Sequence, residues 1–466
     1  MSDAYDLIVI GAGPGGYVAA IRAAQLGMKA AVVEKAEIGG VCLNRGCIPS
    51  KALIRNAEVL SLFKRAGEFG ISIENLKFDF GVAVERSRKA VDRLVKGVEF
   101  LFKKNKVTLY RGTGRLLSST QIEVKPADGG SAQQMTARHL IIATGTRNKP
   151  LPSMTTDGRQ IITSDEALRL NPLPASILIV GGGATGMEFA YVFAVYGVQV
   201  TLIEMLPGIL PGEDAEVSKL LAESLKKLGV IVMTSCQLDG AKIEGGGLAV
   251  TLKTVEGPKT GHFEKVLVAA GRQPNVEGLG LEAAGVGLNE KKYITTNEFL
   301  QTSAETIYAI GDVAGKSLLA HSAMAEGVIA VERIAGKNPP PMNYDNVPRC
   351  VYCQPQVASV GLTEEQARAK GHEIKVGKFS FKANGKALAL AETEGFIKII
   401  ADAKYGEILG VHMVGAEVTE LIGEVTLAKV LEATPMEIRR TIHPHPTLSE
   451  AVMEAAAMVY GEAIHL

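Results

Sequence analysis

The 466-residue sequence predicts an α/β protein with two Rossmann-like βαβ units and a third, α+β domain at its C-terminal end. The first observation behind this prediction is an internal repeat, in which DLIVIGAG at residues 6–13 corresponds to SILIVGGG at residues 176–183. The second is a change after the proline-rich segment at 338–348, beyond which strand and helix patterns alternate without another glycine fingerprint. The chain therefore reads as a duplicated nucleotide-binding unit followed by a different domain.

Each repeat consists of an apolar strand, a glycine-rich turn, a helix pattern and a second strand that ends in Glu. The first glycine allows a tight turn, the second lets backbone N–H groups approach a pyrophosphate, and the third lets helix and strand pack closely. The acid lies 23 residues beyond the first glycine in both repeats, where it can bind ribose hydroxyls. The pattern predicts a dinucleotide on each repeat. The residues are Gly11, Gly13, Gly16 and Glu34 in the first repeat, and Gly181, Gly183, Gly186 and Glu204 in the second.

Glu204 also bears on the choice between the two nicotinamide cofactors. A carboxylate at this place suits the free 2′-hydroxyl of NAD and repels the 2′-phosphate of NADP, which usually meets an Arg. The residues that follow, MLPGIL, supply no Arg. The second repeat is therefore predicted to bind NAD.

The composition excludes several functional classes. Lys plus Arg and Asp plus Glu both number 50, so nucleic acid or an anionic membrane is not expected as the main partner. No apolar run reaches the roughly 18 residues of a membrane span, and no signal or transit peptide is recognised, which predicts a cytoplasmic protein. Five cysteines do not make a secretory disulfide framework, so a disulfide of importance here would be catalytic.

Two cysteines stand close together in GGVCLNRGCIPSK. Cys42 and Cys47 are five positions apart, and on an ideal helix such residues have Cα atoms about 8–9 Å apart, whereas a disulfide usually needs less than ~7 Å. A bridge therefore requires a distorted turn, for which Gly46 and Pro49 provide the means, and strained disulfides are easily reduced. The alternative is two unrelated buried thiols. The spacing favours a redox-active pair.

The segment HPHPTLSE at 443–450 carries a candidate acid–base group. Prolines on both sides stiffen the chain around His445, whose imidazole can take a proton from a thiol and return it near neutral pH. Glu450 could orient that imidazole, but Thr447 and Glu450 also have the spacing of a capping box at the start of a helix. On sequence alone, the cap is the better interpretation of Glu450.

Lys51 and Glu188 each follow a cofactor-proximal motif and form a hypothetical charged pair, with two solvated surface charges as the alternative. Cys350 and Cys353 form a CxxC, but no second CxxC or CxxH completes a metal site, so no metal is predicted. RCVYCQPQVASVG reads as a strand, in which residues three apart face opposite sides. These two cysteines and Cys236 are interpreted as structural.

Together and in this order, the motifs resemble the pyridine nucleotide–disulphide oxidoreductase family over nearly the whole chain. The resemblance implies an FAD-binding domain at 1–149 and 275–347, an NAD-binding domain at 150–274 and a dimerisation (interface) domain at 348–466. It places Lys51 and Glu188 beside the flavin, makes Cys47 the flavin-proximal cysteine and assigns Glu450 to orienting His445. Further residues expected at the cofactors are Gly114, Thr144, Gly145, Asp312, Leu318, Leu319, Ala320 and His321 for FAD, and Gly271 for NAD.

Within that family, the motifs are most similar to the members that oxidise protein-bound dihydrolipoyl groups. Glutathione-type reductases generally use NADPH and carry Arg after the second nucleotide strand. Mercuric reductases have paired cysteines at the C-terminal end, where this chain reads GEAIHL, and soluble transhydrogenases lack the Cys42–Cys47 pair. A subunit with a mainly structural or redox-sensing role is the alternative from another class.

The resemblance also implies partners. They are a second copy of the chain, and either the lipoyl domains and acyltransferase core of a 2-oxo acid dehydrogenase complex or the lipoyl carrier protein of glycine cleavage. One departure concerns the interface strand, where Cys353 and Gln356 replace the family's usual Thr and Glu. This departure concerns the dimer contact and leaves the expected chemistry unchanged.

Overall fold

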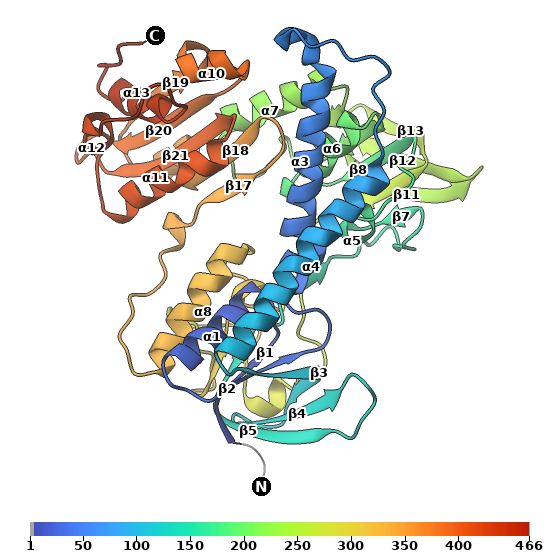
Figure 1. Ribbon diagram of the computed structural model, residues 1–466, viewed down its shortest axis with the longest axis vertical. Helices are drawn as coiled ribbons and strands as arrows, with labels where there is room; N and C mark the ends of the chain where they lie inside the picture. Colours follow the sequence, from blue (N-terminus) through green and yellow to red (C-terminus); the bar gives the residue numbers. More distant parts are fainter. Residues whose placement is uncertain (1–3, 466) are drawn as a thin grey trace. The chain divides into compact units, whose positions relative to one another are not determined.

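The computed structural model describes residues 4–465, which form two compact units (Figure 1). The first unit contains the residues up to Ala52 together with Val82–Lys149 and Gly271–Tyr344. The second contains Leu53–Gly81, Pro150–Ala270 and the residues from Asp345 onward. Residues 53–81, which the sequence had placed in the first domain, thus group by contact with the second unit. The four-segment division into domains remains a prediction.

The first unit is built around a six-stranded sheet in the order β1-β2-β3-β4-β5-β16, with β1 also paired to β5. The short β16 from late in the sequence joins β5 in parallel. Helices α1 and α8 lie side by side in this unit (Figure 1). The strands are β1 (Ala4–Ile10), β2 (Ala30–Glu34), β3 (Thr108–Leu116), β4 (Gln121–Pro126), β5 (Gln133–Ile142) and β16 (Ile307–Ala309), with β6 (Thr146–Asn148) and β15 (Arg272–Pro274) as a separate pair. The helices are α1 (Pro14–Gln25), α2 (Gly40–Arg45) and α8 (Ala320–Ile334).

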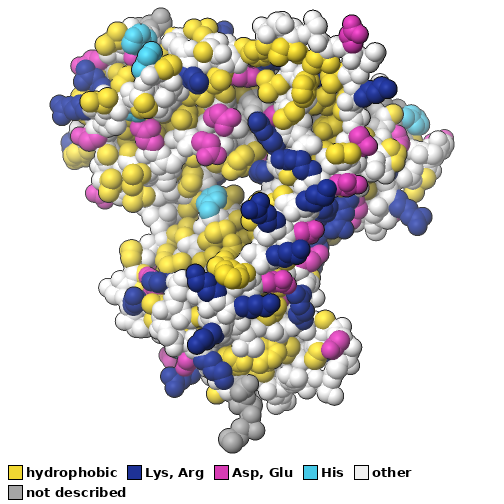
Figure 2. Space-filling view, viewed as in Figure 1, with side chains coloured by type: hydrophobic (Ala, Val, Ile, Leu, Met, Phe, Trp, Pro, Cys, Tyr) yellow, Lys and Arg dark blue, Asp and Glu magenta, His cyan; other side chains and the backbone are white. Residues whose placement is uncertain are grey.

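Two long helices account for most of residues 47–104, where the sequence has charged, helix-like patterns. They are α3 (Cys47–Lys64), which begins in the first unit and ends in the second, and α4 (Phe80–Lys104), with a non-helical stretch between them at 70–79. A band of Lys and Arg side chains, interspersed with acidic ones, follows α4 in Figure 2. This is the charged helix face that ERSRKAVDRLVKGVEFLFKKN predicts.

The second unit contains the second repeat as a five-stranded parallel sheet in the order β10-β9-β8-β14-β7. A three-stranded antiparallel sheet, β11-β12-β13, accompanies it. The strands are β7 (Ile161–Ile162), β8 (Ser176–Val180), β9 (Gln199–Ile203), β10 (Ile231–Met233), β11 (Gln237–Glu244), β12 (Gly247–Thr254), β13 (Gly257–Phe263) and β14 (Lys265–Val268). The helices are α5 (Ser164–Ala167), α6 (Ala184–Val195) and α7 (Ala215–Lys227).

The C-terminal part of the second unit is an antiparallel sheet in the order β17-β18-β21-β20-β19, with helices packed on it around one apolar core. This arrangement confirms the α+β prediction for the end of the chain. Its strands are β17 (Arg349–Val351), β18 (Gln356–Gly361), β19 (Ile374–Ser380), β20 (Phe396–Asp402) and β21 (Ile408–Gly415). Its helices are α9 (Glu364–Ala369), α10 (Gly385–Leu390), α11 (Val418–Val430), α12 (Pro435–Arg440) and α13 (Glu450–Met458).

The prediction of one continuous strand at 349–361 is wrong. The segment forms two antiparallel strands, β17 and β18, separated by a turn at 352–355. The turn contains Pro355, which has no N–H to give to a strand ladder. Cys353 lies in this turn with its sulfur 3.5 Å from the Pro355 carbonyl oxygen, and it is fully buried.

The two glycine turns adopt the same conformation, which explains why their sequences match. The first glycine has a φ of +109° at Gly11 and +116° at Gly181, values that residues with a side chain rarely adopt. A Cβ on Gly16 or on Gly186 would lie 1.9 Å from the carbonyl oxygen of the first glycine of its own repeat. Only glycine lets helix and strand approach so closely. Among the described residues, no helix is long and apolar enough to cross a membrane.

Candidate active site

In the first repeat, the acid at the end of β2 is bound to the glycine turn. The buried carboxylate of Glu34 accepts hydrogen bonds from the backbone N–H groups of Ala12 and Ala36, both at 2.7 Å. Gly13 caps the N-terminus of α1, and a Cβ built on it would meet no atom of the described residues within 4 Å. A fixed carboxylate and open space at a helix N-terminus fit a ribose and a pyrophosphate.

The second repeat has the same arrangement. Buried Glu204 accepts hydrogen bonds from the backbone N–H groups of Gly182 at 2.7 Å and Leu206 at 2.8 Å. Gly183 caps α6 as Gly13 caps α1, and a Cβ on Gly183 would likewise meet none of the described atoms within 4 Å. The second repeat therefore fits a dinucleotide on the same structural grounds as the first.

Asp312 is held by residues that sequence reasoning missed. Its Oδ2 accepts a hydrogen bond from Thr146 Oγ1 at 2.6 Å, and that hydroxyl in turn accepts from Arg272 Nε at 2.7 Å. The neighbouring Thr144 donates to the carbonyl oxygen of Asn275 at 2.8 Å, and Asn275 returns a bond of 2.9 Å to the Thr144 carbonyl. The segments after β5, β14 and β16 are thus joined into one polar cluster in the first unit.

A buried glutamate supports the glycine next to Asp312. Glu326 on α8 is fully buried, and its carboxylate accepts from the Gly311 N–H at 2.5 Å and from the Tyr344 hydroxyl at 2.7 Å. Burial raises the pKa of this carboxyl above its usual range, although the two hydrogen bonds oppose the shift. Sequence reasoning missed Glu326, since a single acid in an apolar helix pattern gives no sign of its partner.

The remaining residues expected at the cofactors lie as follows. Gly114 is on β3, where a Cβ would lie 3.3 Å from side-chain carbons of Ile10 and Val33, a tight contact that a larger residue could make only if these side chains shifted. Gly145 and Gly271 have positive φ angles of 65° and 103°. Residues 318–321 span the start of α8, whose N-cap is Leu319. Their cofactor contacts stay predictions.

The redox candidates sit where one helix ends and the next begins. Helix α2 ends at Arg45, Gly46 is non-helical, and α3 starts at Cys47, so the interruption that the five-residue spacing requires is present. Cys42 and Cys47 lie close to disulfide distance from each other. A hydrogen bond with Cys47 and then burial raise the pKa of Cys42, and the charge of Lys51 offsets this only in part. Cys42 thus keeps its proton, while a Cys47 thiolate would gain from the N-terminus of α3.

His445 and Glu450 are in contact at the start of α13. Nδ1 of His445 lies 2.9 Å from Glu450 Oε1, and the His445 side chain is 78% exposed. The other carboxylate oxygen of Glu450 accepts from the Thr447 N–H at 2.8 Å. Burial raises the pKa of Glu450, but the bonds from Thr447 and His445 outweigh it and hold that pKa below its usual range. The carboxylate therefore stays charged beside the imidazole.

The capping-box prediction for this segment is only half right. Glu450 accepts from the Thr447 N–H as a capping box requires, but the Thr447 hydroxyl donates to the Pro444 carbonyl oxygen at 2.8 Å instead of capping the helix. The helix begins at Glu450, with Ser449 as its N-cap. The hydroxyl thereby braces the turn that carries His445.

A second histidine fixes the same loop and was missed. His443 contacts Glu424 on α11 through Nε2 at 2.8 Å and the Thr441 carbonyl oxygen through Nδ1 at 2.9 Å. The bond to Glu424 raises the pKa of His443 despite partial burial. The signal for it was present, since HPHP holds two histidines, but nothing in the sequence pointed to Glu424.

Glu188 is not a solvated surface charge. It lies buried on α6, where its Oε1 accepts from the backbone N–H of Tyr352 at 3.2 Å. Burial, followed by the charges of Cys350 and Glu188, raises the pKa of Tyr352 to about 12. Lys51 is half-buried on α3 in the first unit. The pairing of Lys51 with Glu188 remains a prediction.

Comparisons with known proteins agree with one another. Residues 5–327 match the family described as "Pyridine nucleotide-disulphide oxidoreductase", and residues 347–456 match its dimerisation domain. The chain is 48% identical to the dihydrolipoyl dehydrogenase of Bacillus subtilis and 46% identical to that of Zymomonas mobilis, with all of both chains covered in each case. Among solved structures, LpdA from Mycobacterium tuberculosis has a TM-score of 0.91 at 30% identity, covering 97% of this chain and 98% of that one. The HOCl-induced flavoprotein disulfide reductase RclA from Escherichia coli has a TM-score of 0.87 at 27% identity, covering 98% of this chain and all of RclA.

Proposed function

Because the chain belongs to the pyridine nucleotide–disulphide oxidoreductase family, we propose that it oxidises protein-bound dihydrolipoyl groups to lipoyl groups and passes hydride to NAD⁺, giving NADH. The observation that carries this proposal is the 48% identity to a dihydrolipoyl dehydrogenase over the full length of both chains. The enzyme is FAD-dependent and uses NAD, as this family does. The two glycine turns with their acids fit these two cofactors. We call them the FAD cradle, around Gly13 and Glu34, and the NAD cradle, around Gly183 and Glu204.

The residues of the chain supply the acid–base and thiol chemistry. With Glu450 accepting from Nδ1 of His445, Nε2 carries the lone pair and takes a proton from one dihydrolipoyl thiol. The resulting thiolate attacks Cys42, the Cys42–Cys47 bond breaks, and Cys47 leaves as a thiolate. The second substrate thiol then displaces Cys42 and gives its proton to the departing sulfur, which closes the lipoyl ring and leaves Cys42 as a thiol and Cys47 as a thiolate. Bound FAD would supply the two-electron chemistry that links the reduced cysteine pair to NAD⁺.

The active form in this proposal is a homodimer. The match to a dimerisation domain at residues 347–456 supports it, as does a group of exposed apolar side chains on that domain, formed by Leu427, Val430, Leu431 and Ile442. Ile442 is 95% exposed and lies three residues before His445. A second copy that covers this patch brings its own surface close to the imidazole.

We further propose that the substrate is carried by another protein. That partner is a lipoyl domain on the acyltransferase core of a 2-oxo acid dehydrogenase complex, or the lipoyl carrier protein of glycine cleavage. This proposal is supported by the activity for which both relatives are named, that of a dihydrolipoyl dehydrogenase. Affinity capture of lipoylated proteins by the purified homodimer, with peptide identification, distinguishes the two kinds of partner.

A direct assay tests the function. Purified holoenzyme supplied with free dihydrolipoamide and NAD⁺ should form NADH without any other protein. The same preparation should be much less active with glutathione disulfide and NADPH, the substrates of the rival class of reductase. Preference for the second pair would refute the proposed substrate, and no turnover of either would favour a structural or redox-sensing role.

The choice of nicotinamide cofactor is tested at Glu204. The wild type should have a far higher kcat/KM with NAD than with NADP. Glu204→Gln, which removes the charge while keeping most of the side chain's shape, should lower that preference by about 1–3 kcal/mol, or roughly 5–150-fold. The corresponding change in the first repeat, Glu34→Gln, is the matched control: it should weaken FAD retention and leave the NAD-to-NADP ratio unchanged. Equal use of both cofactors by the wild type would rule out the assignment.

A further inference from the structure

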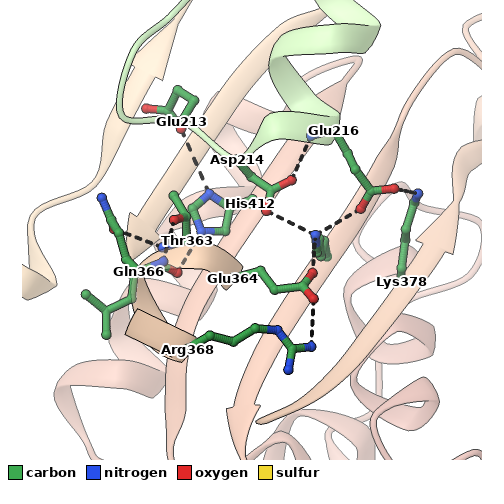
Figure 3. Close-up of polar contacts among 11 residues, drawn as sticks. Glu213, Asp214, Glu216, Thr363, Glu364, Gln366, Arg368, Lys378 and His412 are labelled. Carbon is green, nitrogen blue, oxygen red and sulfur yellow. Dashed lines mark hydrogen bonds and ion pairs between the residues drawn. The ribbon is translucent and has the colours of Figure 1, made fainter. Parts of the chain in front are cut away.

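A lysine buried in the C-terminal part of the second unit holds three carboxylates. Lys398 on β20 is 3% exposed, and its Nζ lies 3.0 Å from Asp214, 2.9 Å from Glu216 and 2.7 Å from Glu364 (Figure 3). Burial lowers the pKa of this lysine, but the three carboxylates outweigh burial and hold its pKa above the usual range. Lys398 is therefore charged at physiological pH. A buried charge of this kind persists only where it is paired.

The cluster fixes the start of α7. Asp214 is the N-cap of that helix through Oδ1, while its Oδ2 binds Lys398. The preceding residue, Glu213, accepts from Arg349 Nε on β17 at 3.0 Å, and Arg349 also donates to the Gly212 carbonyl oxygen at 3.3 Å. Two side chains of the C-terminal sheet, Arg349 and Lys398, thus bind the three successive residues 212–214.

The loop that precedes α7 reaches the NAD cradle at two points. In this loop, residues 205–213, the Leu206 N–H donates to Glu204 at 2.8 Å and the Leu210 N–H donates to the Gly182 carbonyl oxygen at 2.8 Å. Leu210 has a φ of +48°, a left-handed conformation that a residue with a side chain keeps only when its surroundings hold it. The loop therefore positions both the carboxylate expected to meet the ribose and the glycine turn expected to meet the pyrophosphate.

From these contacts we propose that Lys398 is a positioning residue for NAD. It anchors the end of loop 205–213 and, through that loop, the side of the NAD cradle formed by Glu204 and Gly182. Without its charge, Asp214 and Glu216 lose their shared partner, and the loop end is free to move away from the cradle. The inference rests on the proposed use of NAD at the second repeat. It assigns a role in cofactor affinity to a domain that has no nucleotide fingerprint of its own.

Lys398→Met in the FAD-loaded enzyme tests the proposal. Binding of NADH, measured by direct titration, should weaken by about tenfold or more, and the KM for NAD should rise in parallel. The kcat at saturating NAD and the KM for dihydrolipoamide should stay within about twofold of wild type, because the cysteine pair and His445 are untouched. Backbone amides of residues 205–214 should exchange hydrogen faster. A purely structural role would reduce the yield or melting temperature of the enzyme without changing the NADH affinity of the folded fraction.

Lys378→Met is the matched control. Lys378 pairs with the same Glu216 from the exposed side of the cluster and also lies over the Phe396 ring. Its removal should leave NADH affinity and loop exchange within about twofold of wild type.

If Lys398→Met does not accumulate as a folded flavoprotein, Asp214→Asn makes the same test. It keeps an oxygen to cap α7 but removes the ion pair with Lys398. A folded Lys398→Met or Asp214→Asn enzyme with wild-type NADH affinity and wild-type exchange at 205–214 would overturn the proposal. Failure of the wild type to oxidise dihydrolipoamide is a separate result, and would count against the proposed function only.

Discussion

A Cys47→Ser variant is expected to lose dihydrolipoamide turnover by at least about a thousandfold while still binding FAD. The reason is that Cys42 alone cannot form a disulfide, so the substrate thiolate has no S–S bond to attack and no electrons can reach the cofactor through the pair. Serine differs from cysteine by one atom and keeps α3 intact. The measurement is NADH formation together with the flavin content of the purified protein.

Thiol counting gives a second measurement that does not depend on turnover. The chain has 5 cysteines, so the oxidised wild type, unfolded in denaturant, should show three reactive thiols and all five after reduction. Cys47→Ser should show four in both states. Cys350→Ser is the matched control, because it removes a cysteine outside the pair and should retain both turnover and the gain of two thiols. A Cys47→Ser enzyme that kept full turnover would remove this cysteine from the reaction.

Mixing two inactive subunits is expected to restore activity. Cys47→Ser and His445→Gln should each be nearly inactive as homodimers, the second by roughly 10²–10⁴-fold for loss of an acid–base group. If His445 of each subunit serves the cysteine pair of the other, one site of the heterodimer has an intact pair and an intact imidazole. That site should give about half the wild-type activity per dimer. The measurement is turnover by heterodimers isolated through two different affinity tags.

The control is a mixture of Cys42→Ser with Cys47→Ser. Both lesions fall in the cysteine pair, so neither site of that heterodimer has an intact disulfide, and activity should stay at background. Confirmed heterodimers of Cys47→Ser with His445→Gln that remain inactive would show that both groups must come from one chain. In that case the exposure of His445 would need another explanation.

The parts of the molecule that were predictable are those that short stretches of sequence specify. The glycine turns, their helices and the acids at the strand ends lie within about 25 residues of one another, and steric rules for glycine fix their geometry. The break between Cys42 and Cys47 followed from helix dimensions once the two cysteines were interpreted as a bridged pair. The contact of His445 with Glu450 was equally local, although only the family resemblance favoured it over a helix cap.

What escaped prediction depends on residues far apart in the chain. Thr146 meets Asp312 across a separation of 166 residues, and Lys398 meets Asp214 across a separation of 184 residues. From sequence alone, a lysine on a strand such as Lys398 is expected to face solvent, because no neighbouring residue indicates that carboxylates from another part of the chain will pair with it. The strand prediction at 349–361 failed for a different reason, because Pro355 cannot donate to a strand ladder and the chain turns there.

The paired hydrogen bonds on Glu34 and Glu204 have a consequence for how the cofactors are acquired. Each carboxylate is already immobilised by two backbone N–H groups of its own unit, so an arriving ribose meets an acceptor that has no rotational freedom left to lose. The conformational entropy of each glutamate side chain is lost while the chain folds, so none is lost when the dinucleotide binds. The affinity of each cradle therefore reflects preorganisation more than induced fit. Both cradles should therefore keep their shape in the apoprotein, ready to be reloaded with FAD after it has been stripped.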